Sequence, residues 1–348
     1  MTDLSEDDPR EPAIPPAGQD AVPATAEESP LAGEQPVELP SAMPTPVEPA
    51  AVQPSLVPSA PPAAEPPLFQ SFAQPEPRPP ARIPHLGHLL LLFMLGSIGF
   101  VCAVVLLFLA MRFHLFGWDL STKSAMDIRL VLSSEGILYL ATFGIGLAVF
   151  PQIWNKGFFA GIQWRGSVAL RRFWPLAGTA AGCLALAILD EAVMPGPSSS
   201  PIEKMMRSPG AAWLMFGFGI TLAPFFEEMF FRGFLLPSLC TAVDWVVERT
   251  DRRPAPPLDP NGHPQWSLLA MVVASLLTSL PFALLHVEQQ GHSIGPFLLL
   301  IVVSLILCTV RLVTRSLAAS TLVHSCYNFL IFMLAMIGTG GFRHFDKM

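Results

Sequence analysis

Three short strings in the last third of the chain place ionisable and amide side chains inside apolar segments. They are an E-E-x-x-x-R string at 227–232, an F-x-x-x-H string at 282–286 and an H-x-x-x-N string at 324–328. An ionisable side chain at membrane depth costs about 2.5–3.5 kcal/mol on insertion scales, so such residues usually serve a function. The three strings are therefore the first candidates for a site.

The E-E-x-x-x-R string gives its two adjacent carboxylates different neighbours on a helix. Glu228 and Arg232 are four residues apart, so they share one helix face and are expected to form an ion pair. Glu227 lies about 100° further round the helix and is left without a counter-charge. A desolvated carboxylate of this kind suits a general base. Taken singly, the string is equally consistent with an ion-paired helix end at the membrane surface.

The two histidine strings supply a second base and hydrogen-bond donors. His286 ends an apolar run, where a lone histidine is more often interfacial than catalytic. His324 and Asn328 are four residues apart and share one helix face, where they offer donors of the kind an oxyanion hole needs. Polar contacts between helices are the alternative explanation for this pair. Because the three strings fall on three separate helices in the same third of the chain, a common site is favoured over chance placement.

The elements that carry these residues are predicted to be transmembrane helices. The chain is 51% hydrophobic and only 14% charged, whereas soluble domains carry about a quarter charged residues. A bilayer core about 30 Å thick needs about 20 apolar residues per helix, which is more than a strand contains. The fold class is therefore all-α, a polytopic transmembrane helical bundle of about seven spans, or eight. The predicted spans are 88–111, 130–153, 173–194, 211–243, 266–288, 295–312 and 316–338. The 211–243 segment is too long for one span, so it either continues as a helix beyond the bilayer or breaks near Pro237.

Residues 1–83 differ in composition from everything that follows. Residues 1–80 contain 21 of the 37 prolines and carry a net charge of −11, which leaves +4 for the remainder of the chain. We expect an acidic, Pro/Ala-rich, disordered N-terminal tail, because such a segment buries too little apolar area to fold. The domain organisation predicted is this tail, N-terminal transmembrane helices over 84–210 and a core over 211–340. The acidic balance gives no indication of a nucleic-acid partner.

Lys and Arg in the loops predict the orientation. A cytoplasmic N-terminus places eleven of the loop Lys and Arg residues, Arg311 among them, in the cytoplasm and seven on the other side. Cytoplasmic loops carry the excess of basic residues, so the N-terminus is expected inside. With seven spans, the C-terminus is then outside.

In their order and spacing, the three strings resemble the CAAX prenyl endopeptidase and bacteriocin-processing family of intramembrane proteases (CPBP, or Abi), over about 211–335. The resemblance implies an integral membrane peptidase, and the Pro/Ala-rich composition leads us to expect it in the bacterial inner (plasma) membrane. The resemblance also implies a peptide or protein substrate with a membrane-embedded or lipidated segment. Carried over, Glu227 and His286 would activate the attacking water, and His324 and Asn328 would hold the tetrahedral oxyanion. Glu228 with Arg232 would support Glu227.

Two alternatives stay open at this point. Glu227, His286 and His324 could ligate a zinc ion with an open fourth position, although no H-E-x-x-H helix is present and metal-free catalysis is favoured. A catalytically silent scaffold or a bacteriocin-immunity-type peptide-binding protein could use the same pocket. A transporter is disfavoured because the first three spans contain few ionisable residues, mainly Glu135 and the pair Asp190 and Glu191.

Overall fold

The computed structural model describes residues 82–118, 127–194, 204, 206–207, 210–252, 254–255, 257–259 and 263–343. The predicted acidic tail lies outside these residues, apart from Arg82 and Ile83. In the described part the chain is helical, and its only β-type pairing is an isolated bridge between Leu258 and Pro264.

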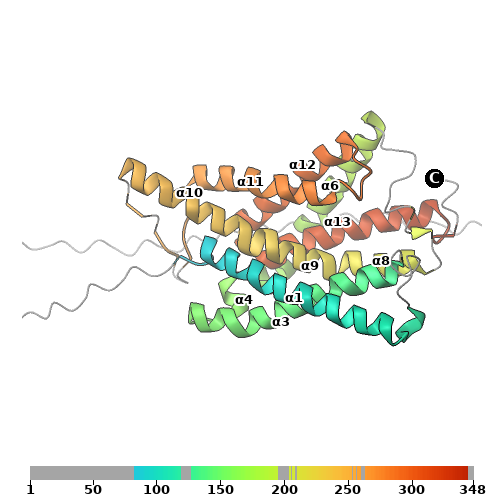
Figure 1. Cartoon of the computed structure of the whole chain (residues 1–348). Helices are drawn as coiled ribbons and strands as arrows, with labels where there is room; N and C mark the ends of the chain where they lie inside the picture. Colours follow the sequence, from blue (N-terminus) through green and yellow to red (C-terminus); the bar gives the residue numbers. More distant parts are fainter. Residues whose placement is uncertain are drawn as a thin grey trace, which may run out of the picture. The chain divides into compact units, whose positions relative to one another are not determined.

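Seven helical segments of the described part are long and apolar enough to cross a membrane, which confirms the predicted helical bundle (Figure 1). Each predicted span coincides with one of them. They are α1 (Leu86–Arg112), α3 (Ile128–Trp154), α6 (Phe173–Val193), the run Ala211–Asp251, α11 (Leu268–His286), α12 (Ile294–Thr314) and α13 (Leu317–Gly338). The short helices η1 (Leu115–Gly117), α4 (Phe158–Gly161) and α5 (Gly166–Arg171) lie between spans.

The long fourth span consists of four helical segments in succession. It comprises α8 (Ala211–Ile220), α9 (Leu222–Glu228), the π-helix η2 (Met229–Leu235) and α10 (Leu236–Asp251). The interruption lies at Thr221, where φ is −121° and ψ is −78°. Pro237 is the second residue of α10, directly after η2, and the chain is helical on both sides of it. Of the two predicted alternatives, the helix that continues to Asp251 is confirmed, and the break near Pro237 is wrong.

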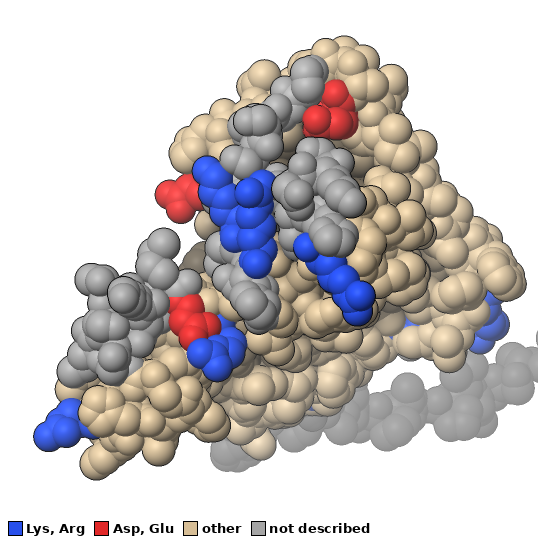
Figure 2. Space-filling view, turned by 90° about the vertical axis from the view of Figure 1, so that its right-hand side faces the viewer, with Lys and Arg blue, Asp and Glu red and all other residues tan. Residues whose placement is uncertain are grey.

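Helix α13 lies in the interior of the bundle and positions the third string. It packs against α6, α8, α9 and α12, while α11 packs between α10 and α12. Helices α1 and α3 form a close pair that also packs against α8, η2 and α10 of the fourth span (Figure 1). Figure 2 shows the end of the molecule at which α13 ends, where acidic and basic residues are scattered over a mostly uncharged surface.

Arg311 has a different place from the one that its sequence position predicts. It was counted among the cytoplasmic loop cations, but it lies inside α12 and only 2% of its surface is exposed. Its Nε donates to the carbonyl oxygen of Arg232 at 3.2 Å, and its Nη2 donates to that of Ile162 at 3.5 Å. The guanidinium is therefore an internal brace for η2, because its hydrogen bonds satisfy backbone carbonyls that water cannot reach.

Candidate active site

Glu228 and Arg232 form the ion pair that their spacing predicts. Both side chains are fully buried, and Arg232 Nη1 lies 2.7 Å from Glu228 Oε1. Arg232 Nη2 also donates to the hydroxyl of Ser304 on α12 at 2.7 Å. The pair thus ties the end of α9 to a neighbouring span.

Glu227 faces the two histidines instead. Its Oε2 lies 3.8 Å from Nε2 of His286 and 3.8 Å from Nε2 of His324. The same oxygen is buried and has no hydrogen-bond partner within the described residues. Three strings that are far apart in sequence therefore bring a carboxylate and two imidazoles to one point.

The Nδ1 atom of each imidazole lies within hydrogen-bond distance of an acceptor, which determines that this nitrogen carries a hydrogen. His286 Nδ1 lies 2.7 Å from the carbonyl oxygen of Phe282, and His324 Nδ1 lies 3.1 Å from Glu228 Oε1. A carbonyl and an ionised carboxylate only accept hydrogen bonds, so each Nδ1 carries a hydrogen. In its neutral form each ring then presents the lone pair of its Nε2 to Glu227, and in its protonated form it donates from Nε2 instead.

Asn328 lies one turn beyond His324, and its side chain bonds to the backbone just before the interruption at Thr221. Its Nδ2 donates to the carbonyl oxygen of Gly219 at 2.8 Å. The last carbonyls of a helix have no intrahelical donor, and α8 ends at Ile220. One N–H of the amide is used in this bond, and the second remains available to a substrate.

All four residues line one cavity of about 460 Å³. Helices outside the three strings also line it, through Glu135 of α3 and Asp190 and Glu191 of α6. The amino-acid sequence alone does not predict this role for the three carboxylates. The signal available was the presence of ionisable residues in apolar spans, but none of the three belongs to a spaced string.

Glu227, His286 and His324 are side chains of the types that ligate zinc. In the part of the chain that the structure describes, no group of three or more His, Cys, Asp and Glu side chains is arranged to hold a metal ion.

Residues 209–330 match the family model described as Rce1-like, type II CAAX prenyl endopeptidase. The matched segment contains all three strings, so the predicted resemblance to CAAX-type intramembrane proteases is confirmed. No curated protein and no solved structure matches the chain. Together with its seven apolar helices, the match indicates an integral membrane protein with a segment similar to this family of peptidases.

Proposed function

We propose that this CAAX-type peptidase domain hydrolyses a peptide bond of a membrane-associated substrate, with Glu227 and His286 activating the attacking water. The observation that supports it most is the approach of Glu227 Oε2 to the two Nε2 atoms, at 3.8 Å each, inside a cavity. Converging bases in a cavity of this size are typical of a hydrolytic site.

The water is placed between Glu227 and His286. Both the carboxylate and the bare Nε2 accept hydrogen bonds, so a water molecule there donates to both. Its oxygen attacks the carbonyl carbon as the Glu227–His286 pair takes a proton. When the C–N bond breaks, the same pair returns a proton to the leaving amine. The net reaction adds one water across the peptide bond.

We assign the oxyanion to Asn328 and His324. The free N–H of the Asn328 amide can donate to it directly. His324 donates through Nε2 only as the imidazolium, and the Glu228 carboxylate at 3.1 Å from Nδ1 stabilises that charge. Glu228 and Arg232 are accordingly supporting residues that hold His324 in place.

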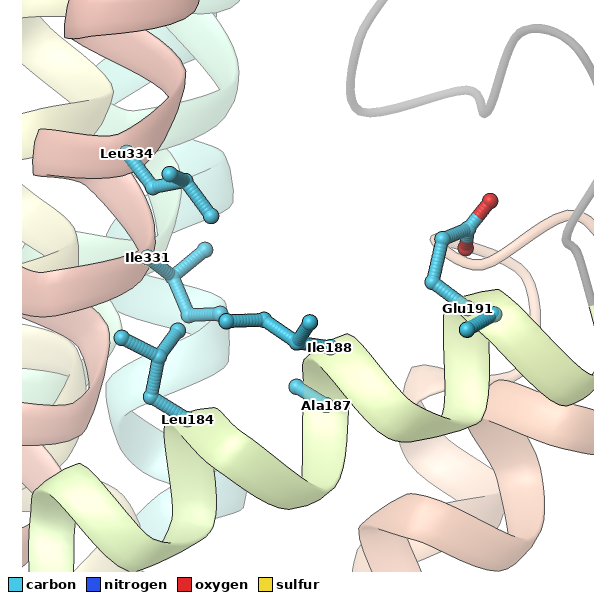
Figure 3. Close-up of a pocket in the computed structure, with 7 residues that line it drawn as sticks. Leu184, Ala187, Ile188, Glu191, Ile331 and Leu334 are labelled. Carbon is cyan, nitrogen blue, oxygen red and sulfur yellow. The ribbon is translucent and has the colours of Figure 1, made fainter.

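A hydrophobic anchor on the substrate has a place beside the cavity. An apolar groove of about 400 Å³ lies between α6 and α13. Figure 3 shows Leu184 and Ile188 facing Ile331 and Leu334 across it, with Glu191 further along α6. The groove and the catalytic cavity share Ala187, Glu191 and Ile331. A membrane-embedded or lipidated segment in the groove would present its adjoining peptide to the bases.

The remaining parts of the proposal concern location and metal. We propose a location in the bacterial inner membrane, and the distribution of Lys and Arg supports a cytoplasmic N-terminus. We propose metal-free catalysis, with zinc on Glu227, His286 and His324 as the alternative. The competing function is a silent scaffold or immunity-type peptide-binding protein. The convergence of two bases with oxyanion donors disfavours it, because binding a peptide requires no such set.

The test incubates purified protein in detergent with a peptide library, with and without a chelator, and identifies products by mass spectrometry. Wild-type protein is expected to cleave, and His286→Ala is expected not to. Glu288→Gln is the matched control, because Glu288 is an exposed carboxylate two residues from His286 that does not line the cavity. Cleavage that His286→Ala retains would overturn the proposal. Cleavage lost only with chelator and restored by zinc would establish the metal alternative.

A further inference from the structure

Glu135 is a carboxylate of the catalytic cavity that lies outside the matched residues 209–330. It is half-buried on α3, about 10 Å along the axis from the start of that helix. It lines the same cavity as Glu227 and His286 and interacts electrostatically with both. The N-terminal helices therefore contribute a charged group to the site.

The position of Glu135 is fixed by an aromatic clamp. The hydroxyl of Tyr139, one turn later on α3, donates to Glu135 Oε1 at 2.7 Å. The Tyr139 ring stacks on Phe226, with centroids 4.7 Å apart, and on Phe218 at 6.2 Å. Phe226 directly precedes Glu227, so the clamp joins α3 to the residue that carries the catalytic carboxylate. One oxygen of Glu135 accepts from Tyr139, and the residue lines the cavity.

No Lys or Arg side chain compensates this charge in the described structure. None of the residues that line the cavity there is Lys or Arg, and no described Lys or Arg pairs with Glu135. Arg232 is already occupied by Glu228. The cavity also contains Glu227 Oε2, which is buried without a hydrogen-bond partner. Negative charge in a site of low dielectric attracts a cation more strongly than it would in water.

We propose that Glu135 is a specificity-determining residue whose carboxylate binds a Lys or Arg side chain of the substrate close to the scissile bond. The proposal rests on the proposed function, because it assigns a subsite of the same cavity. A basic side chain compensates the charge of Glu135, whereas an acidic one is repelled by Glu135 and Glu227 together. An apolar side chain gains neither effect.

The experiment uses the full-length protein in detergent and one cleaved peptide. At each position in turn, the peptide carries Lys, norleucine or Glu, and kcat/KM is measured for each. For wild-type protein, at least one position next to the scissile bond should favour Lys over norleucine by about tenfold, which corresponds to about 1.4 kcal/mol. Glu should be disfavoured there.

Variants then assign the preference to one carboxylate. Glu135→Gln keeps the side-chain size and an acceptor for Tyr139, and it should bring the Lys-to-norleucine ratio at that position close to one. Glu135→Lys should favour the Glu peptide instead. Tyr139→Phe keeps the carboxylate but removes its hydrogen bond, so the ratio should fall only partly. Glu288→Gln should keep the wild-type ratio.

The outcomes separate this proposal from the function on which it rests. Cleavage by wild-type protein with no preference for Lys at any position would overturn the role of Glu135 and leave the peptidase intact. A preference that persists in Glu135→Gln would do the same. A wild-type protein that cleaves no peptide would refute the proposed function and this proposal with it. If Glu135→Gln does not fold, the wild-type preference for Lys and the fall of the Lys-to-norleucine ratio in Tyr139→Phe still test the role of Glu135.

Discussion

At the scale of single residues, the site depends on one helical turn that points two adjacent carboxylates in different directions. Glu228 is fully buried against Arg232, whereas Glu227 faces His286 and His324. Glu228 nevertheless contacts a residue of the proposed oxyanion site, because it also accepts the hydrogen bond of His324 Nδ1. The buried Glu228–Arg232 pair and Glu227 are therefore linked through the imidazole of His324.

Glu228→Gln should destabilise the protein. The substitution leaves the fully buried Arg232 without a counter-charge, which typically costs about 3–5 kcal/mol. Thermal unfolding in detergent measures this as a lowered Tm. The double variant Glu228→Gln/Arg232→Met removes both charges and should regain much of the Tm. It should stay poorly active, because His324 Nδ1 lacks its carboxylate. A single variant as stable as wild type would contradict this account of the pair.

Asn328→Ala should slow the chemical step more than it weakens substrate binding. Removal of one oxyanion donor typically lowers kcat by about 10²–10³-fold. Steady-state kinetics on a cleaved peptide should show that loss in kcat with a smaller change in KM. Because Asn328 also bonds the carbonyl of Gly219, circular dichroism must show that the variant is folded. An unchanged kcat in a folded variant would remove Asn328 from the proposed oxyanion site.

At the scale of elements, hydropathy predicts all seven spans. A run of about 20 apolar residues is long enough to cross the bilayer as a helix, and a helix satisfies its own backbone hydrogen bonds there. The i,i+4 spacings also predicted the Glu228–Arg232 pair and the shared face of His324 and Asn328. What hydropathy does not encode is local backbone geometry. The interruption at Thr221 and the π-helix η2 depend on tertiary contacts, such as the one from Arg311. Glu135 was missed for the same reason, because only the packing of α3 brings it to the cavity.

The close approach of α1 and α3, which presents Glu135, depends on Gly99. A Cβ at this position would lie 2.6 Å from Thr142 Oγ1 and 3.0 Å from the carbonyl oxygen of Leu138, a backbone atom that cannot easily move. Gly99→Val should therefore lower the free energy of unfolding by about 1–3 kcal/mol. Gly96→Val is the matched control, since nothing lies within 4 Å of a Cβ there. Equal Tm values for the two variants would show that this contact does not limit the packing.

The loop between α10 and α11 should make stability depend on pH. Burial lowers the pKa of His263 to about 4, and its backbone N–H donates to the Asp259 carboxylate at 2.9 Å. The folded protein keeps this imidazole neutral, while the unfolded chain protonates it near pH 6.5. Stability should therefore fall as the pH drops from about 6.5 towards 4. Tm measured from pH 7 to 5 should fall more in wild type than in His263→Gln. Parallel curves would contradict this role.

At the scale of the whole molecule, the bundle has two different ends. The catalytic residues lie towards the end where α11 stops at His286 and α12 begins at Ile294. At the other end, Arg165 and Arg315 lie 3.8 and 3.6 Å from the Asp259 carboxylate. With the N-terminus in the cytoplasm, the basic end faces the cytoplasm and the cavity faces away from it.

Labelling of single cysteines tests that orientation. In a background without the five native cysteines, Arg171→Cys and Glu288→Cys each place one thiol at an exposed position at opposite ends of the bundle. A membrane-impermeant maleimide added to intact cells should label only Glu288→Cys. Arg171→Cys should be labelled only after the membrane is opened. The reverse pattern would invert the orientation and place the cavity on the cytoplasmic side.

The central claim is that Glu227 performs chemistry in a site that also binds the substrate. The most direct test compares peptide binding and single-turnover cleavage in wild-type protein and in Glu227→Gln. The account predicts that Glu227→Gln binds the peptide with an affinity within a few-fold of wild type and that its cleavage rate falls at least about 10³-fold. A Glu227→Gln protein that cleaves at the wild-type rate would contradict it.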